Sequence, residues 1–488
     1  MTTTYLTKRG LTVLLPALLI SACMVGPEYQ KPDVPLPNDF RYQISVPDAT
    51  SFADLPWWSV FNDKTLQALI NEALAHNYDL EVAVARIEQA RAQVGQVEAE
   101  GRPQIGYDAS AVGEKGFVPQ VKGGTGTLTY GAFTGLLTAA WEFDIWGRIR
   151  HATDAAKANL LAQEDVRRGV ILTLVSDVAS DYFKLLELDR ELAIAEESSR
   201  VYKSTLELFT LRFESGKDSR LPVERAQAAY QFSLADIQDL KRRIAQQENA
   251  ISTLVGAYPR TIARGKPLTD QSTPETPLGS TTALLQRRPD ILQAEQDMIR
   301  ANAQIGEAVA DFFPRIGLSS FLGGQGVTIS NIWSSFGVWN LALALTGPIY
   351  SGGRLEEAYH ERQGFWDETV AAYKQIVLVA FRETSDALVA RQTLALRLTA
   401  LGEQVRALQR SSEIALLRYQ AGRASYFEVL EAQQQLFPAE DAQAQNERDQ
   451  LLAVVNLYKA LGGGWSADDN GKAPPTINAV NTQVPAGG

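Results

Sequence analysis

Two long stretches of the chain carry apolar residues at the spacing of an α-helix. Between Arg150 and Glu214 there is no proline and only one glycine, Gly169. Apolar side chains recur there every three or four residues, at Ile171, Leu174, Val178, Tyr182, Leu185, Leu188 and Leu192. This spacing places them on one helix face. A helix of that length would extend roughly 100 Å, so it can pack only in an elongated, coiled-coil-like array.

Shorter segments follow a period of two residues instead. Bulky side chains alternate with small or polar ones at Trp339, Asn340, Leu341, Ala342, Leu343, Ala344, Leu345 and Thr346. The same alternation sets Phe133, Leu137 and Trp141 apart from Thr134, Thr138 and Glu142. This pattern predicts strands with one bulky face, as in a lipid-facing barrel, although a half-buried soluble sheet gives it too. The glycine-rich stretches 122–126 and 323–326 predict loops between paired strands.

The chain contains an internal duplication, which carries more information than any single motif. Residues 102–106 match residues 313–317 at an offset of 211. Gly147, Gly216 and Gly256 match Gly353, Gly422 and Gly462 at an offset of 206. Each copy therefore predicts a helix, two strands and two long helices, which span 150–214 and 221–255, then 354–419 and 426–461. Pro438 stands where the first copy has Phe232, so a kink is expected in the second copy alone.

Composition removes several classes of function. The 488 residues include one cysteine and three histidines, which excludes a disulfide framework and a Cys/His metal site. A net charge of −11 without a basic block argues against nucleic-acid binding. His76, His151 and His360 have no catalytic partners at useful spacing, and neither a nucleophile elbow nor a phosphate-binding loop occurs. The sequence thus predicts a protein that is not an enzyme and uses neither a metal nor another cofactor.

The amino terminus predicts a lipid anchor. Lys8 and Arg9 precede the apolar stretch 11–20, as in a secretory signal peptide. The stretch ends in Ile20-Ser21-Ala22-Cys23, which is similar to a bacterial lipobox. We expect lipidation of Cys23, because the only cysteine stands where that processing needs a thiol; ordinary cleavage near Ala22 is the alternative. Acyl chains would then hold the protein to the outer membrane.

The predicted strands need partners from other chains. Four strands per chain cannot close a barrel, and an open sheet edge is not tolerated in hydrocarbon. Two copies would give eight strands, whose interior side chains fill, whereas three copies would give twelve and leave a passage. The long helices would continue from the sheet as a helical cylinder. These requirements favour a homotrimer that forms a membrane conduit.

The mature amino terminus, residues 23–32 (Cys-Met-Val-Gly-Pro-Glu-Tyr-Gln-Lys-Pro), resembles the TolC-like outer-membrane factors of tripartite efflux systems and their lipoprotein branch. So do Trp57, Trp58, Phe61 and Asp63, and the turns around Gly216 and Gly422. The resemblance implies an α+β membrane protein with a duplicated helix–β-hairpin–long helix–long helix unit. Its trimer would form a 12-stranded barrel above a long α-helical periplasmic barrel. It also implies a periplasmic adaptor (membrane fusion) protein and an inner-membrane efflux pump as partners.

The same resemblance implies a constriction at the helix tips. The acidic ring positions fall on Glu428 and Glu431, and the brace positions on Arg418 and Tyr419. For the two glutamates, an ordinary solvated helix face remains the alternative. The carboxylate that usually pairs with the brace aligns with Pro222, which cannot replace it. The turns at Gly216 and Gly422 would face the adaptor.

The domain organisation follows from these assignments: signal peptide 1–22, lipidated segment and equatorial helix 23–75, first repeat 76–258, linker 259–286, second repeat 287–463 and tail 464–488. The predicted function is a passive exit duct for drugs or other small molecules, metal ions included, which an inner-membrane pump exports. The alternative is a non-conducting periplasmic coiled-coil lipoprotein. That alternative predicts a protein that is soluble once its lipid site is removed, whereas the channel predicts trimers that need detergent.

Overall fold

The computed structural model describes the chain over residues 24–42, 60, 62–119, 125–271, 273–274, 281–327 and 337–463. Several sequence predictions fall outside this part of the chain. They concern the signal peptide, the lipidation site Cys23, the aromatic residues Trp57, Trp58 and Phe61, and the tail 464–488.

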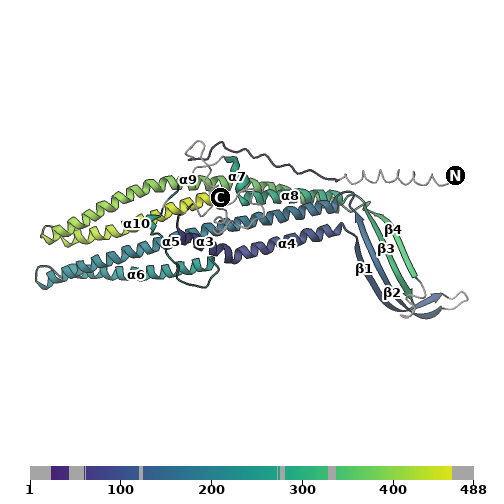
Figure 1. Ribbon diagram of the computed structural model, residues 1–488, viewed down its shortest axis with the longest axis horizontal. Helices are drawn as coiled ribbons and strands as arrows, with labels where there is room; N and C mark the ends of the chain where they lie inside the picture. The colour runs from purple at the N-terminus through teal and green to yellow at the C-terminus, as the bar shows by residue number, and fades with distance from the viewer. Residues whose placement is uncertain are drawn as a thin grey trace, which may run out of the picture. The chain divides into compact units, whose positions relative to one another are not determined.

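The predicted order of elements is confirmed in both copies (Figure 1). Helix α3 (Lys64–His76) precedes the first copy, which contains α4 (Tyr78–Glu100), β1 (Gln104–Pro119), β2 (Thr125–Phe143), α5 (Arg148–Glu214) and α6 (Leu221–Leu254). A 3-10 turn, η3 (Leu268–Asp270), and a short helix, α7 (Thr281–Arg287), connect the copies. The second copy contains α8 (Pro289–Ala310), β3 (Arg315–Gly326), β4 (Gly337–Thr346), α9 (Arg354–Gln420) and α10 (Tyr426–Ala460).

The chain divides into two compact units. A strand unit comprises residues 1–33, 86–164 and 293–373, and a helical unit comprises residues 34–85, 165–292 and 374–488. Helices α5 and α9, 67 residues each, run through both units. Each would extend roughly 100 Å at 1.5 Å per residue, which agrees with the long helices predicted from the sequence.

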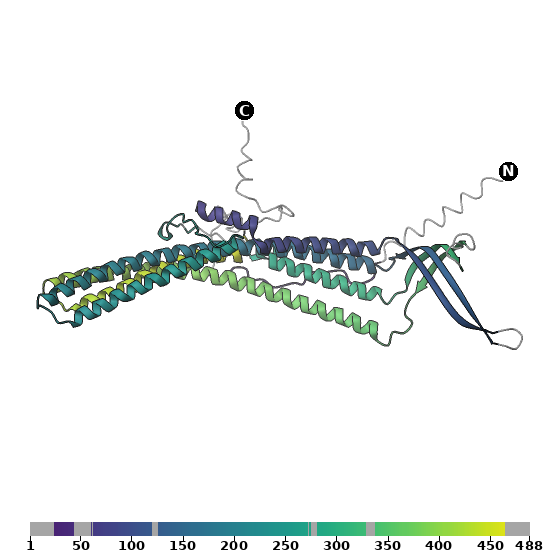
Figure 2. The same ribbon diagram turned by 90° about the horizontal axis from the view of Figure 1, so that it is seen from below.

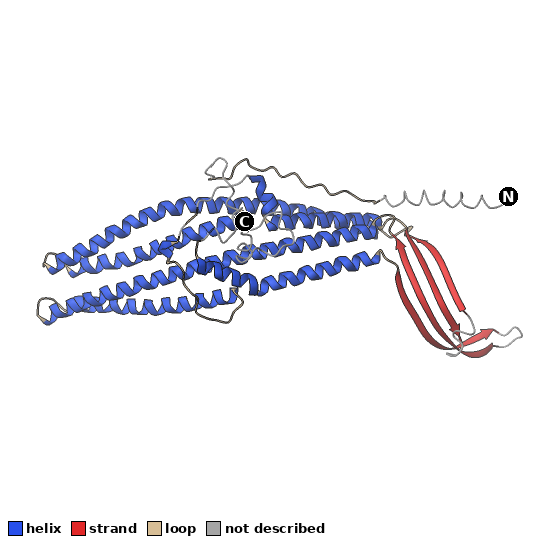
Figure 3. Cartoon of the chain, in the orientation of Figure 1, coloured by secondary structure: helices blue, strands red, loops and turns tan. Residues whose placement is uncertain are grey.

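The strand unit contains one antiparallel sheet with strand order β1-β2-β3-β4 (Figure 3). The register brings one bulky residue from each strand into a single row: Tyr107, Leu137, Leu322 and Trp339. The neighbouring row on the opposite face carries Gly106, Thr138, Phe321 and Asn340. The period of two therefore corresponds to a sheet with one predominantly apolar face. The outer edges of β1 and β4 have no partner strand within the described residues.

The prediction of a loop at 323–326 is wrong. These residues form the end of β3, where Gly323 to Gly326 pair with Leu136 to Phe133 of β2. A Cβ atom on Gly323 would lie 2.0 Å from the carbonyl oxygen of Gly135. Glycine is present because two backbones approach closely inside the sheet. A run of glycines has the same composition in a turn, so composition alone predicted a loop. In the first copy, Thr125 and Gly126 likewise belong to β2, and residues 122–124 lie outside the described chain.

An extended amino-terminal segment packs on the helices of the strand unit. The backbone N–H of Val25 donates to the carbonyl of Trp146 at 3.1 Å, and Nε2 of His151 lies 2.6 Å from the carbonyl oxygen of Val25. Asn302 donates to the carbonyl of Pro27 at 3.0 Å. The residues that directly follow Cys23 are thus bound to the folded unit.

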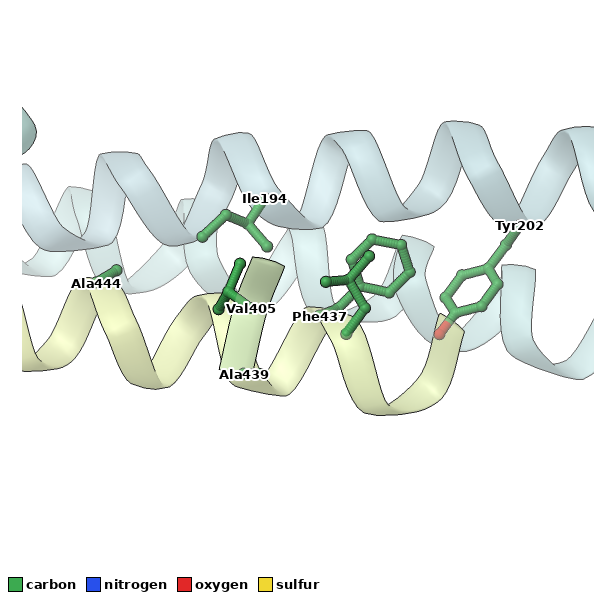
Figure 4. Packing of buried hydrophobic residues seen from close by; sticks show 7 residues of the cluster. Ile194, Tyr202, Val405, Phe437, Ala439 and Ala444 are labelled. Carbon is green, nitrogen blue, oxygen red and sulfur yellow. The ribbon is translucent and has the colours of Figure 1, made fainter. Parts of the chain in front are cut away.

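The helical unit consists mainly of two helical hairpins, α5–α6 and α9–α10. Their turns lie side by side at one end of the unit (Figure 2). Apolar side chains from all four helices meet close to these turns in a cluster of Phe209, Ala226, Ala415, Tyr419, Val429, Leu430 and Ala432. A second cluster around Phe437 and Tyr202 follows further along the helices (Figure 4). Helix α10 runs through Pro438 without interruption, and the kink expected there stays a prediction.

The duplication is visible in backbone geometry. Gly147 and Gly353 have φ angles of 85° and 86°, Gly216 and Gly422 of 69° and 70°, and Gly256 and Gly462 of 71° and 68°. The helix ends are also capped in parallel ways. The side chain of Asn77 donates to the carbonyl of Leu254 at 3.0 Å, and Arg288 donates to that of Ala460 at 3.1 Å. The two copies therefore share their turns as well as their order of elements.

Candidate functional site: the helix tips

Both helical hairpins turn through the same backbone motif. The N–H groups of Gly216 and Gly422 donate to the carbonyls of Phe213 and Tyr419 at 2.9 and 3.0 Å. The N–H of the residue after each glycine reaches back five residues, at 2.9 and 2.8 Å. This is a Schellman cap, which requires a positive φ and therefore favours glycine.

A hydrogen bond links the two hairpins at this end. The hydroxyl of Tyr419, near the end of α9, donates to Oδ2 of Asp218 in the α5–α6 turn at 2.7 Å. The Nε of Arg212 donates to the same oxygen at 2.6 Å, and its guanidinium carbon lies 4.7 Å from the centre of the Tyr419 ring. We call Arg212, Asp218 and Tyr419 the tip lock.

The electrostatics of the tip lock follow from these contacts. The hydrogen bond from Tyr419, together with Arg212, lowers the pKa of Asp218 from its ordinary value, so the carboxylate is charged at neutral pH. Burial, and then the neighbouring Asp218 carboxylate, raises the pKa of Tyr419 to about 12, so its hydroxyl remains a donor. The ring of Tyr419 packs against Phe209 at 5.1 Å between centroids. The lock thus combines a charge-assisted hydrogen bond with a buried ring.

The sequence identified Tyr419 but missed its partner. The position aligned with the missing carboxylate, Pro222, lies in the first turn of α6, and Asp218 accepts the hydrogen bond four residues earlier. Asp218 has no acidic counterpart in the second copy, where the offset of 206 places Ala424. Comparison of the copies therefore could not reveal it. Arg212 was visible as the counterpart of Arg418 in the repeat.

The second brace residue, Arg418, contacts one of the two predicted ring glutamates. Its Nη1 lies 3.3 Å from Oε2 of Glu428, and its Nη2 donates to the carbonyl of Arg423 at 3.3 Å. Glu428 also accepts from the backbone N–H of Ser425 at 3.3 Å, which caps the start of α10. Glu431 is exposed and accepts only from Gln435, at 3.4 Å, among the described residues. The pair is therefore chemically unequal.

Both glutamates line a groove of about 600 Å³ between α9 and α10, together with Arg410 and Arg418. Their spacing of three residues places them on one side of α10, as predicted. The groove therefore carries charges of both signs, with Glu431 the less neutralised carboxylate.

The described residues show neither a metal site nor a membrane-spanning helix. No group of three His, Cys, Asp or Glu side chains in that part of the chain could hold a metal ion. None of the helices described is long and apolar enough to cross a membrane.

Comparison with known proteins assigns the family. The model of the outer membrane efflux protein family matches residues 69–257 and 281–463, one match for each copy of the repeat. The chain belongs to the outer membrane efflux protein family.

Characterised relatives agree with this assignment. The chain is 32% identical to the cation efflux system protein CusC of Escherichia coli (strain K12) over 453 residues, which is 92% of this chain and 98% of that protein. It is 33% identical to the probable efflux pump outer membrane protein TtgC of Pseudomonas putida over 470 residues, 94% and 96% of the two chains. A solved structure of the outer-membrane channel OprN covers 91% of this chain and all of its own, with a TM-score of 0.83 and 30% identity.

Family membership confirms the channel interpretation over the non-conducting lipoprotein. This outer membrane efflux protein is the exit duct of a tripartite system, located in the outer membrane and extending into the periplasm. It acts as a homotrimer with a periplasmic adaptor and an inner-membrane pump. The trimer accounts for the unpartnered edges of β1 and β4 in the described chain, because three four-stranded sheets close one twelve-stranded barrel.

Proposed function

We propose that the protein is a passive duct for small molecules and metal cations, and that the tip lock holds its periplasmic end closed at rest. Among its relatives, CusC belongs to a cation efflux system and TtgC to an efflux pump. We infer that the chain carries out no chemistry, because the tip residues make only hydrogen bonds, ion pairs and ring contacts. The choice of substrate then belongs to the pump.

The observation that supports the closed state is the 2.7 Å hydrogen bond between Tyr419 and Asp218. It joins the two hairpins, so α9 cannot move away from the α5–α6 turn without breaking it. A hydrogen bond to a charged group at a partly exposed site contributes about 1–2 kcal/mol. Three locks per trimer would hold a narrow tip closed while leaving it within reach of a partner's binding energy.

The acidic ring is proposed to attract cations at that end. In a trimer, three copies of Glu431 would surround one axis without a close cationic partner, whereas Glu428 is partly neutralised by Arg418. Clustered carboxylates raise the local cation concentration. The turns at Gly216 and Gly422 would meet the adaptor, and an acylated Cys23 would anchor the chain to the membrane.

The lock is tested by single-channel recording in planar lipid bilayers. Tyr419→Phe removes the donor of the hydrogen bond, and Asp218→Asn removes the charge that strengthens it, and both keep the side-chain shape. Each should increase the time spent open several-fold, with the larger effect in Tyr419→Phe. The matched control is Tyr426→Phe at the same tip, since the Tyr426 hydroxyl makes no hydrogen bond within the described residues. Unchanged open times in both lock variants, with the control also unchanged, would refute the closed-state role.

The ring is tested by block with multivalent cations. Glu431→Gln should weaken block by hexamminecobalt(III), and adding Glu428→Gln should contribute less, because Arg418 already neutralises part of that charge. Glu403→Gln, an exposed glutamate on α9, serves as the control. Equal block in the double variant and the native channel would show that these carboxylates do not line the passage.

A further inference from the structure

A second groove, separate from the tip lock, lies between α5, α6 and α10. It has a volume of about 670 Å³, within the range of small-molecule sites. The groove is predominantly apolar. Asp236 and Asp441 lie at the end away from the helix tips, and Glu431 and Arg225 lie at the end near the tips, where Arg225 sits over the ring of Tyr426. The groove wall includes Ile194, Tyr202, Phe232, Asp236, Phe427, Phe437 and Asp441.

Aromatic rings form much of the groove wall. Tyr202 of α5 and Phe437 of α10 meet edge to face, with centroids 5.3 Å apart, and Figure 4 shows Tyr202 directed toward α10. Within one chain, Phe232 of α6 and Phe427 of α10 remain largely uncovered, with 73% and 53% of their surface exposed. Exposed phenylalanines beside a groove offer ring faces to a ligand.

One polar group on the groove wall has no protein partner among the described residues. Tyr202 is only 7% exposed, yet its hydroxyl makes no hydrogen bond within the described residues. Burial raises the pKa of this hydroxyl to about 12, so it is a neutral donor and acceptor. The hydroxyl borders the groove, so the polar group of a ligand would form a hydrogen bond with it in place of water.

One end of the groove carries carboxylates in excess. Asp236 of α6 and Asp441 of α10 line it, and Glu191 of α5 lies behind them. Glu191 is already bound by Arg243 at 3.2 Å and by Gln445 at 2.9 Å. Arg243 is therefore engaged with Glu191, and neither Asp236 nor Asp441 forms an ion pair among the described residues.

We propose that this groove binds organic cations that have an aromatic or apolar body. The positive group would meet Asp236 and Asp441, and the body would stack on the rings of Phe232, Phe427 and Phe437. Carboxylates and aromatic faces both favour a cation, and neither favours an anion of equal size. The site goes beyond the exit function, because it would hold a ligand in the helical wall, away from the tip lock.

Equilibrium dialysis of the detergent-solubilised trimer tests the proposal with two ions of matched shape. Tetraphenylphosphonium should bind the trimer above a detergent-only reference, and tetraphenylborate should not. The double variant Asp236→Asn with Asp441→Asn should weaken tetraphenylphosphonium binding at least about tenfold, by removing two partly buried charges. Asp239→Asn, one turn further along α6 and paired with Arg242, is the matched control and should bind normally.

The binding should also depend on pH. Burial, and then the nearby Glu191, Asp236 and Glu440, raises the pKa of Asp441 to about 7, against the opposing effect of Arg243. Asp441 is therefore charged above that pH and protonated below it. Tetraphenylphosphonium binding should weaken from pH 8 to pH 6 in the native trimer, and this dependence should vanish in the double variant.

Phe232→Ala gives an independent test at an exposed position, where loss of folding is not expected. It should weaken tetraphenylphosphonium binding several-fold by removing a ring face. Equal binding of the phosphonium and the borate, or unchanged phosphonium binding in both the double variant and Phe232→Ala, would overturn the proposal.

Discussion

Asp63 is a buried carboxylate that joins three segments of the helical unit. It is 2% exposed and accepts hydrogen bonds from the N–H groups of Thr65 and Lys266 at 2.8 and 3.1 Å. Tyr182 and Gln271 donate to it through their side chains at 3.0 and 2.8 Å. One acidic side chain therefore caps α3 and ties it to α5 and to the linker before α7.

Replacing Asp63 should lower the stability of the protein more than replacing an exposed acidic residue. Asp63→Ala removes the cap and leaves several buried donors unpaired, so we expect a loss of about 2–4 kcal/mol. The measurement is the thermal midpoint of the trimer by circular dichroism. Asp386→Ala, an exposed carboxylate on α9, is the control. Equal midpoints for the two variants would contradict the role of Asp63.

The contribution of Asp63 should depend on pH in a defined direction. Burial alone would raise its pKa, but the hydrogen bonds, led by that from Gln271, lower it below the ordinary value of 3.8. A lowered folded-state pKa stabilises the fold above the unfolded value, and this contribution is lost as pH falls through the folded value. The difference in thermal midpoint between the native protein and Asp63→Asn should therefore be largest at pH 6 and become smaller below about pH 4.

At the scale of single residues, the sequence indicated which positions matter better than it indicated which residues they contact. Asp63 belongs to the Trp57–Asp63 motif that carries the family resemblance, and Tyr419 was assigned through that resemblance and the repeat, so the sequence singled out both positions. Asp218 follows neither a motif nor the repeat, and only the fold brings it to Tyr419, 201 residues away. Contacts of that kind depend on how helices meet, which periodicity does not specify.

At the scale of elements, the duplicated glycines separate two physical reasons for glycine. Gly256 and Gly462, like Gly216 and Gly422 at the tips, have positive φ angles between 68° and 71°. A Cβ atom on Gly256 would lie 2.1 Å from the carbonyl oxygen of His76, and one on Gly462 would lie 2.8 Å from that of Arg287. At Gly216 and Gly422 nothing lies within 4 Å. Gly256 and Gly462 therefore need glycine both for the positive φ angle and because a Cβ atom would clash with the backbone. Gly216 and Gly422 need it only for the positive φ angle.

Alanine substitutions should therefore fall into two groups. Gly216→Ala and Gly422→Ala should each cost about 1–2 kcal/mol from backbone strain alone. Gly256→Ala and Gly462→Ala should cost more, since the backbone must also move, and Gly256→Ala should be the worst. The yield and thermal midpoint of purified trimers measure this order. A tip variant as damaging as Gly256→Ala would show that the tips are packed more tightly than a single chain reveals.

The long helices were predicted well because the evidence for a helix adds up over many residues. Residues 150–214 contain no proline and one glycine, and the apolar spacing from Ile171 to Leu192 is that of a helix, so the boundaries predicted for α5 agree within two residues. The glycines at 323–326 led to a wrong loop prediction, because glycine-rich sequence occurs both in turns and in strands whose backbones lie close together. Only the pairing of β3 with β2 distinguishes the two.

At the scale of the whole molecule, α9 exposes three large apolar side chains on one face, which we call the α9 stripe and which the described part of the chain leaves uncovered. Leu378, Leu396 and Ile414 are 66%, 69% and 55% exposed. They are spaced by 18 residues, which is five full helical turns, so they share one face of the helix. Large apolar side chains in contact with water are unfavourable. Because the protein is a homotrimer, we expect the neighbouring chain to cover the α9 stripe.

Placing charge on this stripe should therefore weaken the trimer without unfolding the protomer. Leu396→Glu with Ile414→Glu would bury two carboxylates against apolar neighbours, which assembly can avoid only by leaving the stripe in water. Native mass measurement in mild detergent should show a marked rise in monomer, with helical content unchanged by circular dichroism. The control is Ala395→Glu, which adds a carboxylate at an exposed site about 100° around the same helix. If the double variant stays fully trimeric, the stripe faces solvent or another protein, and the trimer depends on other surfaces.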